Sequence, residues 1–177
     1  MPRYRRSLTG STYFFTVVTH RRRPILCDDA VRVPLRHAID RVRSRLPFTT
    51  DAMVLMPDHL HCIWTLPDGD TDFPIRWSQI KHHVSYTCSR LYPITLSRSR
   101  QHRGAGSIWQ RRFWEHQIRD EIDMERHVDY IHYNPVKHGF VAAASEWPYS
   151  TFGRFVRSGL YPVNWGGNPA CDGMEFE

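Results

Sequence analysis

The chain is most informative over Met56-Pro57-Asp58-His59-Leu60-His61-Cys62-Ile63-Trp64, where two histidines lie two residues apart in an apolar run. Side chains of a strand alternate between its two faces. His59 and His61 would therefore point one way, while Leu60, Cys62 and Trp64 would point the other. The segment predicts a β-strand that is apolar on one face and offers two imidazoles to a single divalent cation on the other.

Further strands are predicted on both sides of this segment. Phe48 to Met56 and His59 to Leu66 read as two strands joined by a tight turn at Pro57-Asp58. Ser11 to His20 is rich in aromatic and β-branched residues and forms the first strand, closed by the basic turn Arg21-Arg22-Arg23-Pro24. A fourth strand is expected within Ile108 to Ile118.

Three helices are predicted between and after these strands. Asp28 or Asp29 caps the first, whose apolar residues recur about every 3.6 positions up to Leu46. The second covers about Phe73 to Tyr92, and the third about Ile122 to Tyr133. The order β-α-β-β-α-β plus a helix predicts an α+β fold with a ferredoxin-like or RRM-like core, in which helices pack on one face of an antiparallel sheet.

The length of 177 residues suits one domain, expected to span 1–177. A basic loop is expected near 93–107, where Ser, Arg, Gln and Gly predominate, and an irregular aromatic tail near 146–177. The four cysteines include no C-x-x-C pair, which argues against a zinc ribbon or a disulfide framework. Since no disulfide framework is indicated, we expect a reduced, cytoplasmic and nucleoid-associated protein, and no apolar run approaches the roughly 20 residues of a membrane span.

Charge points to a phosphate-rich partner. The formal net charge is +6, and the 24 basic residues are arginines apart from Lys81 and Lys137. Guanidinium groups bind phosphate at two points, although a GC-rich genome would also favour arginine over lysine. Codon bias exchanges arginine for lysine and leaves the positive sum unchanged.

A second informative segment covers His127 to Gly139. Tyr130 and Asn134 stand four residues apart and so share one face of a helix. Tyr133 is the rival for any role as nucleophile, but Lys137 would occupy the position one turn after it. Each residue has an ordinary alternative, because tyrosine often lines a core and Asn134 before Pro135 is also a helix-ending signal.

Together these motifs resemble a known family. The His59-Leu60-His61 pair, Tyr130, Asn134 and the stretch Trp109-Gln110-Arg111-Arg112-Phe113-Trp114-Glu115-His116 resemble the HUH single-tyrosine transposases of insertion sequences. The likeness is strongest to their domesticated relatives, the REP-associated tyrosine transposases of bacteria. It extends over nearly the whole chain, from Tyr4-Arg5-Arg6 to Gly159-Leu160-Tyr161-Pro162.

The resemblance implies a metal-dependent endonuclease that cleaves and rejoins single-stranded DNA at hairpin-forming repeats, such as repetitive extragenic palindromes. Tyr130 matches the nucleophile, which forms a 5′-phosphotyrosine link. His59, His61 and Asn134 match the metal ligands, and two neutral imidazoles with one amide suit Mg²⁺ or Mn²⁺. The self-contained relatives suggest a monomer, with a dimer as the alternative.

Candidates to contact DNA are basic or aromatic. Trp109 or Trp114 would stack on bases, unless these rings and Phe113 are core residues, which is expected of at least two of the three. The arginines expected to hold phosphates are Arg3, Arg5, Arg6, Arg21, Arg22, Arg23, Arg111 and Arg112.

Two other functions remain open. A non-catalytic RRM-like module would bind single-stranded nucleic acid by stacking bases on aromatic residues of its first and third strands. A zinc hydrolase would need a carboxylate base, but Asp58 is expected to point away from both histidines. The sequence leaves open the target repeat, the cellular metal and whether the protein still moves DNA.

Overall fold

The computed structural model describes residues 11–92 and 108–166. Arg3, Arg5 and Arg6, the loop at 93–107 and the end of the tail lie outside these residues. Within the described ranges no helix is long and apolar enough to cross a membrane.

Four antiparallel strands form a single sheet in the order β2-β3-β1-β4. This is the strand order of the predicted ferredoxin-like core, and the α+β prediction is confirmed. Strands β1 and β3 are central, with Thr16 opposite His61 and Val18 opposite His59. The bounds agree with the prediction to within a few residues for β1 (Thr12–Val18), β2 (Thr49–Leu55) and β3 (His59–Thr65), and β4 (Trp114–Gln117) lies inside its expected range.

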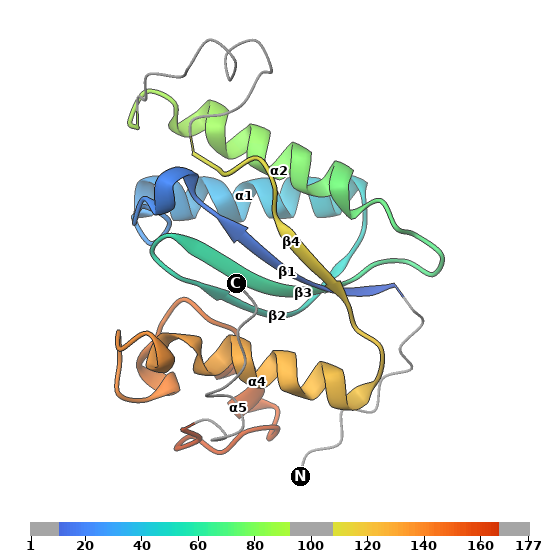
Figure 1. Cartoon of the computed structure of the whole chain (residues 1–177), viewed down its shortest axis with the longest axis vertical. Helices are drawn as coiled ribbons and strands as arrows, with labels where there is room; N and C mark the ends of the chain where they lie inside the picture. The colour runs from blue at the N-terminus through green and yellow to red at the C-terminus, as the bar shows by residue number, and fades with distance from the viewer. Residues whose placement is uncertain (1–10, 93–107, 167–177) are drawn as a thin grey trace.

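Helices cover both faces of this sheet (Figure 1). Helices α1 (Asp29–Arg45) and α2 (Phe73–Cys88) lie on one face, whereas α4 (Glu121–Lys137) and α5 (Phe152–Arg157) lie on the other. The prediction that the helices share one face is therefore wrong for α4. The reason is that the central strands carry buried apolar residues on both sides, with Phe14 and Ile63 facing α4 while Phe15 and Cys62 face α1 and α2.

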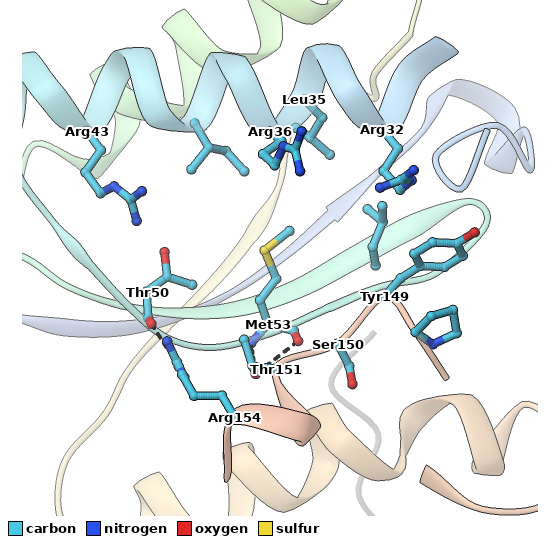
Figure 2. Close-up of a pocket in the computed structure, with 13 residues that line it drawn as sticks. Arg32, Leu35, Arg36, Arg43, Thr50, Met53, Tyr149, Ser150, Thr151 and Arg154 are labelled. Atoms are coloured by element: carbon cyan, nitrogen blue, oxygen red, sulfur yellow. Dashed lines mark hydrogen bonds between the residues drawn. The ribbon is translucent and has the colours of Figure 1, made fainter. Parts of the chain in front are cut away.

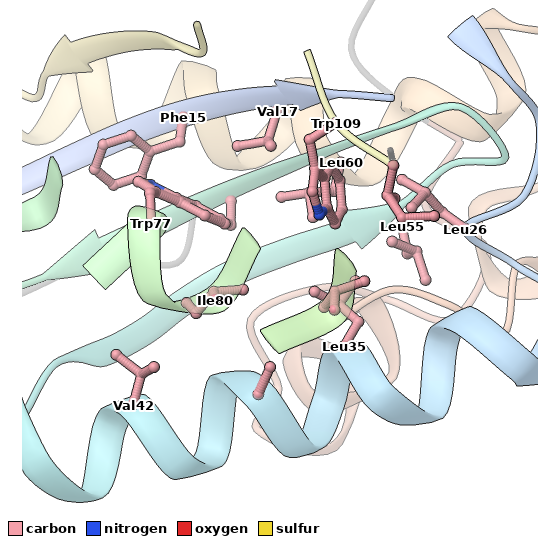
Figure 3. Packing of buried hydrophobic residues seen from close by; sticks show 14 of the residues in the cluster. Phe15, Val17, Leu26, Leu35, Val42, Leu55, Leu60, Trp77, Ile80 and Trp109 are labelled. Atoms are coloured by element: carbon pink, nitrogen blue, oxygen red, sulfur yellow. The ribbon is translucent and has the colours of Figure 1, made fainter. Parts of the chain in front are cut away.

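Aromatic rings dominate the core between the sheet and α1 and α2. The indoles of Trp64 and Trp77 stack with centroids 4.2 Å apart. Phe15 meets Trp77 edge-on (Figure 3). Trp109 joins this core and is only 4% exposed. A base has no access to such a ring, so the stacking role predicted for Trp109 is not supported. Phe113 also packs here, whereas Trp114 is 41% exposed.

Helix α4 continues through Pro135 to Lys137, four residues beyond its predicted end. Proline has no amide proton and usually disrupts a helix interior. Here only two helical residues follow it, and the His138 amide closes the last turn by donating to the Asn134 carbonyl at 3.0 Å. Asp120 caps the other end of the helix by accepting from the Asp123 amide at 2.8 Å.

The tail is more regular than predicted. It contains the short 3₁₀ turn η2 (Ala144–Glu146) and helix α5. Residues 149–151 run along the outer edge of β2, where the Leu55 amide donates to the Tyr149 carbonyl and the Thr151 amide to the Met53 carbonyl, both at 2.8 Å. These bonds satisfy backbone groups that an open edge strand would expose.

His132 connects α4 to this tail. Its Nε2 atom lies 2.9 Å from the Thr151 hydroxyl, and its ring stands edge-on to that of Phe155 with the ring centroids 4.5 Å apart. Burial, aided by the positive charge of Arg154, lowers the pKa of His132 to about 3. The imidazole is therefore neutral in the folded protein at neutral pH.

We expect the free energy of unfolding to fall as the pH drops from about 6.5 towards 3. The unfolded chain binds a proton at His132 near its ordinary pKa of about 6.5, whereas the folded chain excludes it. The slope attributable to His132 approaches about 1.4 kcal/mol per pH unit. Urea titrations of the wild type and His132→Gln at about pH 7 and 5 measure it, with His37→Gln, an exposed position on α1, as control. Equal pH slopes in all three proteins would contradict this assignment.

Candidate metal and tyrosine site

His59 and His61 lie on the face of β3 that α4 covers, as the alternation predicts. Their side chains are 3% and 0% exposed, and their ring centroids are 4.7 Å apart. Two neighbouring imidazoles in one strand can share a cation without any change of the backbone.

Thr16 on the adjacent strand orients the ring of His61. The threonine hydroxyl lies 2.9 Å from Nδ1 of His61, while the buried Nε2 has no hydrogen-bond partner among the described residues. Burial, together with positive charge at His59, His138 and Lys137, lowers the pKa of His61 well below its usual value. The ring is thus neutral, which is the form that donates a lone pair to a metal.

His59 is held by Asp58, whose Oδ1 lies 2.7 Å from Nδ1 of the ring. The prediction that Asp58 points away from both histidines is wrong, because Asp58 belongs to the turn and escapes the strand alternation. Partial burial raises the pKa of Asp58, but hydrogen bonds with His59 and Arg22 outweigh this effect and lower it overall. A carboxylate on one imidazole nitrogen commonly orients the other nitrogen towards a metal.

Helix α4 brings Tyr130 to the histidine pair. The tyrosine ring stands edge-on to His61 with centroids 5.1 Å apart, and Lys137 places its Nζ atom 5.3 Å from the centre of the same ring. Tyr130 is 1% exposed, whereas Tyr133 is partly exposed. The helix therefore turns Tyr130, and not its rival, towards the sheet.

Asn134 completes this face of the helix. It follows Tyr130 by one turn and precedes His138 by one turn, and the ring of His138 lies 5.6 Å from that of His59. The amide is fully buried, and neither its oxygen nor its nitrogen has a hydrogen-bond partner among the described residues. Leaving such a group unsatisfied costs about 1–3 kcal/mol. The buried, unpartnered Nε2 of His61 and amide oxygen of Asn134 are both atom types that can bind a divalent cation.

A second polar cluster lies at the N-terminal end of α4. The ligand atoms of His116, Asp123 and His127 all lie within 4.8 Å of one another, so these residues form a possible metal site. They also bond to each other, since His116 Nε2 lies 2.8 Å from Asp123 Oδ2 and His127 Nδ1 lies 2.7 Å from the Asp123 carbonyl. The cluster ties β4 to the first turns of α4.

Sequence reasoning missed this cluster and three supporting residues. The spacing of Asp123 and His127 is a readable helical signal, but His116 joins them only because β4 pairs with β1. Thr16 and Asp58 support the histidines through pairings across the sheet and its turn. His138 comes directly after the helix that carries Tyr130. It follows Asn134 by four residues, as Asn134 follows Tyr130, and this spacing is the signal that could have identified it.

The predicted phosphate-binding arginines within the described residues gather near the His59 end of the sheet. Arg21, Arg22 and Arg23 follow β1, and the segment before Arg111 runs beside them, with the Gln110 amide donating to Val18 and the His20 amide to Ile108. Arg22 pairs with Asp58 at 3.3 Å, and Arg23 lies over the ring of Tyr92. The exposed side chains are Arg21, Arg22, Arg111 and Arg112.

Comparisons with known proteins identify the family of the chain. Residues 7–134 match the family described as "Transposase IS200 like". A REP-associated tyrosine transposase of Escherichia coli K12 is 47% identical over 95% of this chain and 93% of its own length. A Haemophilus influenzae protein provisionally given the same name is 41% identical over 96% of both chains.

A solved structure extends the comparison to three dimensions. A REP-associated tyrosine transposase bound to a REP hairpin superposes with a TM-score of 0.76 at 46% identity, covering 95% of this chain and 93% of the other. The family match covers residues 7–134, and the identities extend over nearly the full length of the relatives. The chain therefore belongs to the IS200-like family of single-tyrosine transposases, among its REP-associated members.

Proposed function

We propose that this chain cleaves and rejoins single-stranded DNA at hairpin-forming repeats, through a covalent bond between Tyr130 and the 5′-phosphate. The observation that carries the proposal is the edge-on approach of Tyr130 to His61, at 5.1 Å, beside the buried amide of Asn134. A relative solved with a REP hairpin supports this class of substrate.

The reaction exchanges one phosphoester bond for another. The Tyr130 hydroxyl gives up its proton as its oxygen attacks the scissile phosphorus. A new oxygen–phosphorus bond forms, the bond to the 3′-oxygen breaks, and that oxygen takes up a proton to leave a 3′-hydroxyl. Because the phosphotyrosine bond retains the energy of the phosphodiester, the reverse attack by a 3′-hydroxyl reseals DNA without ATP. A Mg²⁺ or Mn²⁺ ion held by His59, His61 and Asn134 would offset the negative charge that builds on the non-bridging phosphate oxygens.

The chain's own groups prepare this step. Asp58 and Thr16 hold the two imidazoles in place before DNA arrives, which avoids the cost of ordering them later. Lys137 adds a positive charge beside Tyr130, where negative charge accumulates. Since Tyr130 is 1% exposed, we infer that its surroundings open when DNA binds.

The RRM-like alternative needs an open sheet on which bases can stack. In the described residues both faces of the sheet are covered, one by α1 and α2 and the other by α4. On the first strand, where this alternative expects stacking aromatics, Phe14 and Phe15 are fully buried. The geometry therefore favours the endonuclease.

We expect Tyr130→Phe to abolish a covalent adduct while DNA binding stays within about threefold of the wild type. The substitution removes only the nucleophilic oxygen. The measurement is a denaturing protein gel after incubation with labelled hairpin DNA from the intergenic repeats of the source genome, with Mg²⁺ or Mn²⁺. Tyr133→Phe is the matched control and should form the adduct normally.

EDTA should also abolish the adduct. An adduct that persists in Tyr130→Phe and disappears in Tyr133→Phe would show that Tyr133, and not Tyr130, is the nucleophile. Tight binding with no adduct across several repeat sequences would instead favour the RRM-like binder.

We also expect the metal to bind at the histidine pair rather than at the second cluster. In a Tyr130→Phe background with hairpin DNA present, loss of both imidazoles in His59→Ala/His61→Ala should weaken Mn²⁺ binding by about 100-fold or more. Electron paramagnetic resonance of free Mn²⁺ measures this binding. His116→Ala serves as the comparison and should change Mn²⁺ affinity little; the reverse pattern would move the metal to His116, Asp123 and His127.

A further inference from the structure

A pocket of about 360 Å³ opens at the outer edge of the sheet, beside β2. Helix α1 forms one wall, and the chain from Pro148 to Arg154 forms the other (Figure 2). Its floor includes Met53, whose backbone pairs with Thr151. Because Met53 packs with the α1 and α2 core, the pocket lies away from the face that carries His59 and His61.

Arginines give this pocket a strong positive charge. Arg32, Arg36, Arg43 and Arg154 line it, and no carboxylate does. Three of the four are partly engaged, since Arg32 pairs with Asp29, Arg43 pairs with Asp40, and Arg154 donates to the Thr50 carbonyl at 3.1 Å. Arg36 is exposed and makes no hydrogen bond or ion pair with any described residue.

The interior of the pocket is apolar and aromatic. Leu35, Ile39 and Met53 contribute hydrocarbon surface. The guanidinium of Arg32 lies 5.2 Å from the centre of the Tyr149 ring, which leaves a flat cation–aromatic wall. A cationic rim around an apolar floor matches a ligand that has a phosphate at one end and a planar ring at the other.

We propose that this pocket binds one nucleotide, with its phosphate on the arginine rim and its base against Met53 and Tyr149. The volume lies at the lower end of the roughly 300–1,000 Å³ of small-ligand sites, as one nucleotide requires. The favoured source is an unpaired nucleotide of the bound DNA, and this choice rests on the proposed function. A free mononucleotide would have the same chemistry.

The pocket wall also contacts the helix that carries Tyr130. Thr151 donates to the Met53 carbonyl and lies within hydrogen-bond distance of His132 on α4. A nucleotide held here therefore rests one side chain away from the catalytic helix, although it occupies the opposite side of β2. The pocket would therefore anchor the DNA at a nucleotide away from the phosphate that is cut.

The test measures fluorescence anisotropy of a labelled hairpin oligonucleotide from the intergenic repeats, at several salt concentrations. We expect Arg36→Gln/Arg43→Gln to weaken binding by about tenfold. The slope of the logarithm of the binding constant against the logarithm of the salt concentration should become shallower by about 0.7 per lost phosphate contact. Arg41→Gln is the matched control, because Arg41 is an exposed arginine of the same helix that faces His83. Thermal unfolding of each variant checks that the fold is retained.

Competition with dAMP separates the two sources. Displacement of the hairpin by dAMP from the wild type, but not from Arg36→Gln/Arg43→Gln, would support a nucleotide of the hairpin as the occupant, whereas dAMP that binds the wild type without displacing the hairpin would assign the pocket to a free nucleotide. Equal hairpin affinity and equal salt dependence in the wild type, Arg36→Gln/Arg43→Gln and Arg41→Gln would overturn the proposal that a nucleotide of the bound DNA occupies the pocket. Adduct formation by Tyr130, assayed at saturating DNA, reports separately on the proposed function, so that either idea can fail alone.

Discussion

Burial of both faces of β3 is the constraint on which the rest of the structure depends. Leu60, Cys62 and Trp64 fill the core under α1 and α2, so the alternate residues His59 and His61 are turned towards α4. A shift of one residue in register would exchange the two sets and bury the histidines in the aromatic core. Stability and the site geometry are thus set by the same pairing.

Helix α4 contacts β4 and the tail and also carries Tyr130 and Asn134. His127 packs against β4 through the cluster with Asp123, and His132 packs against the tail through Thr151. Tyr130 and Asn134 lie between or beside these anchors, so contacts that stabilise the helix also set the position of the proposed nucleophile. This arrangement favours a rigid scaffold, which a reaction needing close alignment requires.

The charges are arranged in two zones. The buried imidazole of His61 and the amide of Asn134 are neutral, and the charged groups beside them are Asp58, which holds His59, and Lys137, which lies over the ring of Tyr130. Arginines stand outside this site, at the His59 end of the sheet and around the pocket beside β2. The exposed arginines can attract phosphates over a long range. His61 and Asn134 are buried as neutral groups, so the desolvation cost of burying a charge at these two positions is avoided.

The sequence by itself determined the strands, the histidine pair and the i,i+4 spacing of Tyr130 and Asn134, because these follow from local periodicity, and it indicated the α+β class through the order of the elements along the chain. Only the tertiary structure decided that α4 covers the face opposite α1 and α2, that Trp109 is buried, and that Asp58 turns back to His59. It also decided which distant residues meet, as Thr16 meets His61 and Arg154 meets Thr50. Periodicity specifies which face of an element is apolar, whereas the partner of that face is chosen by packing between segments far apart in the chain.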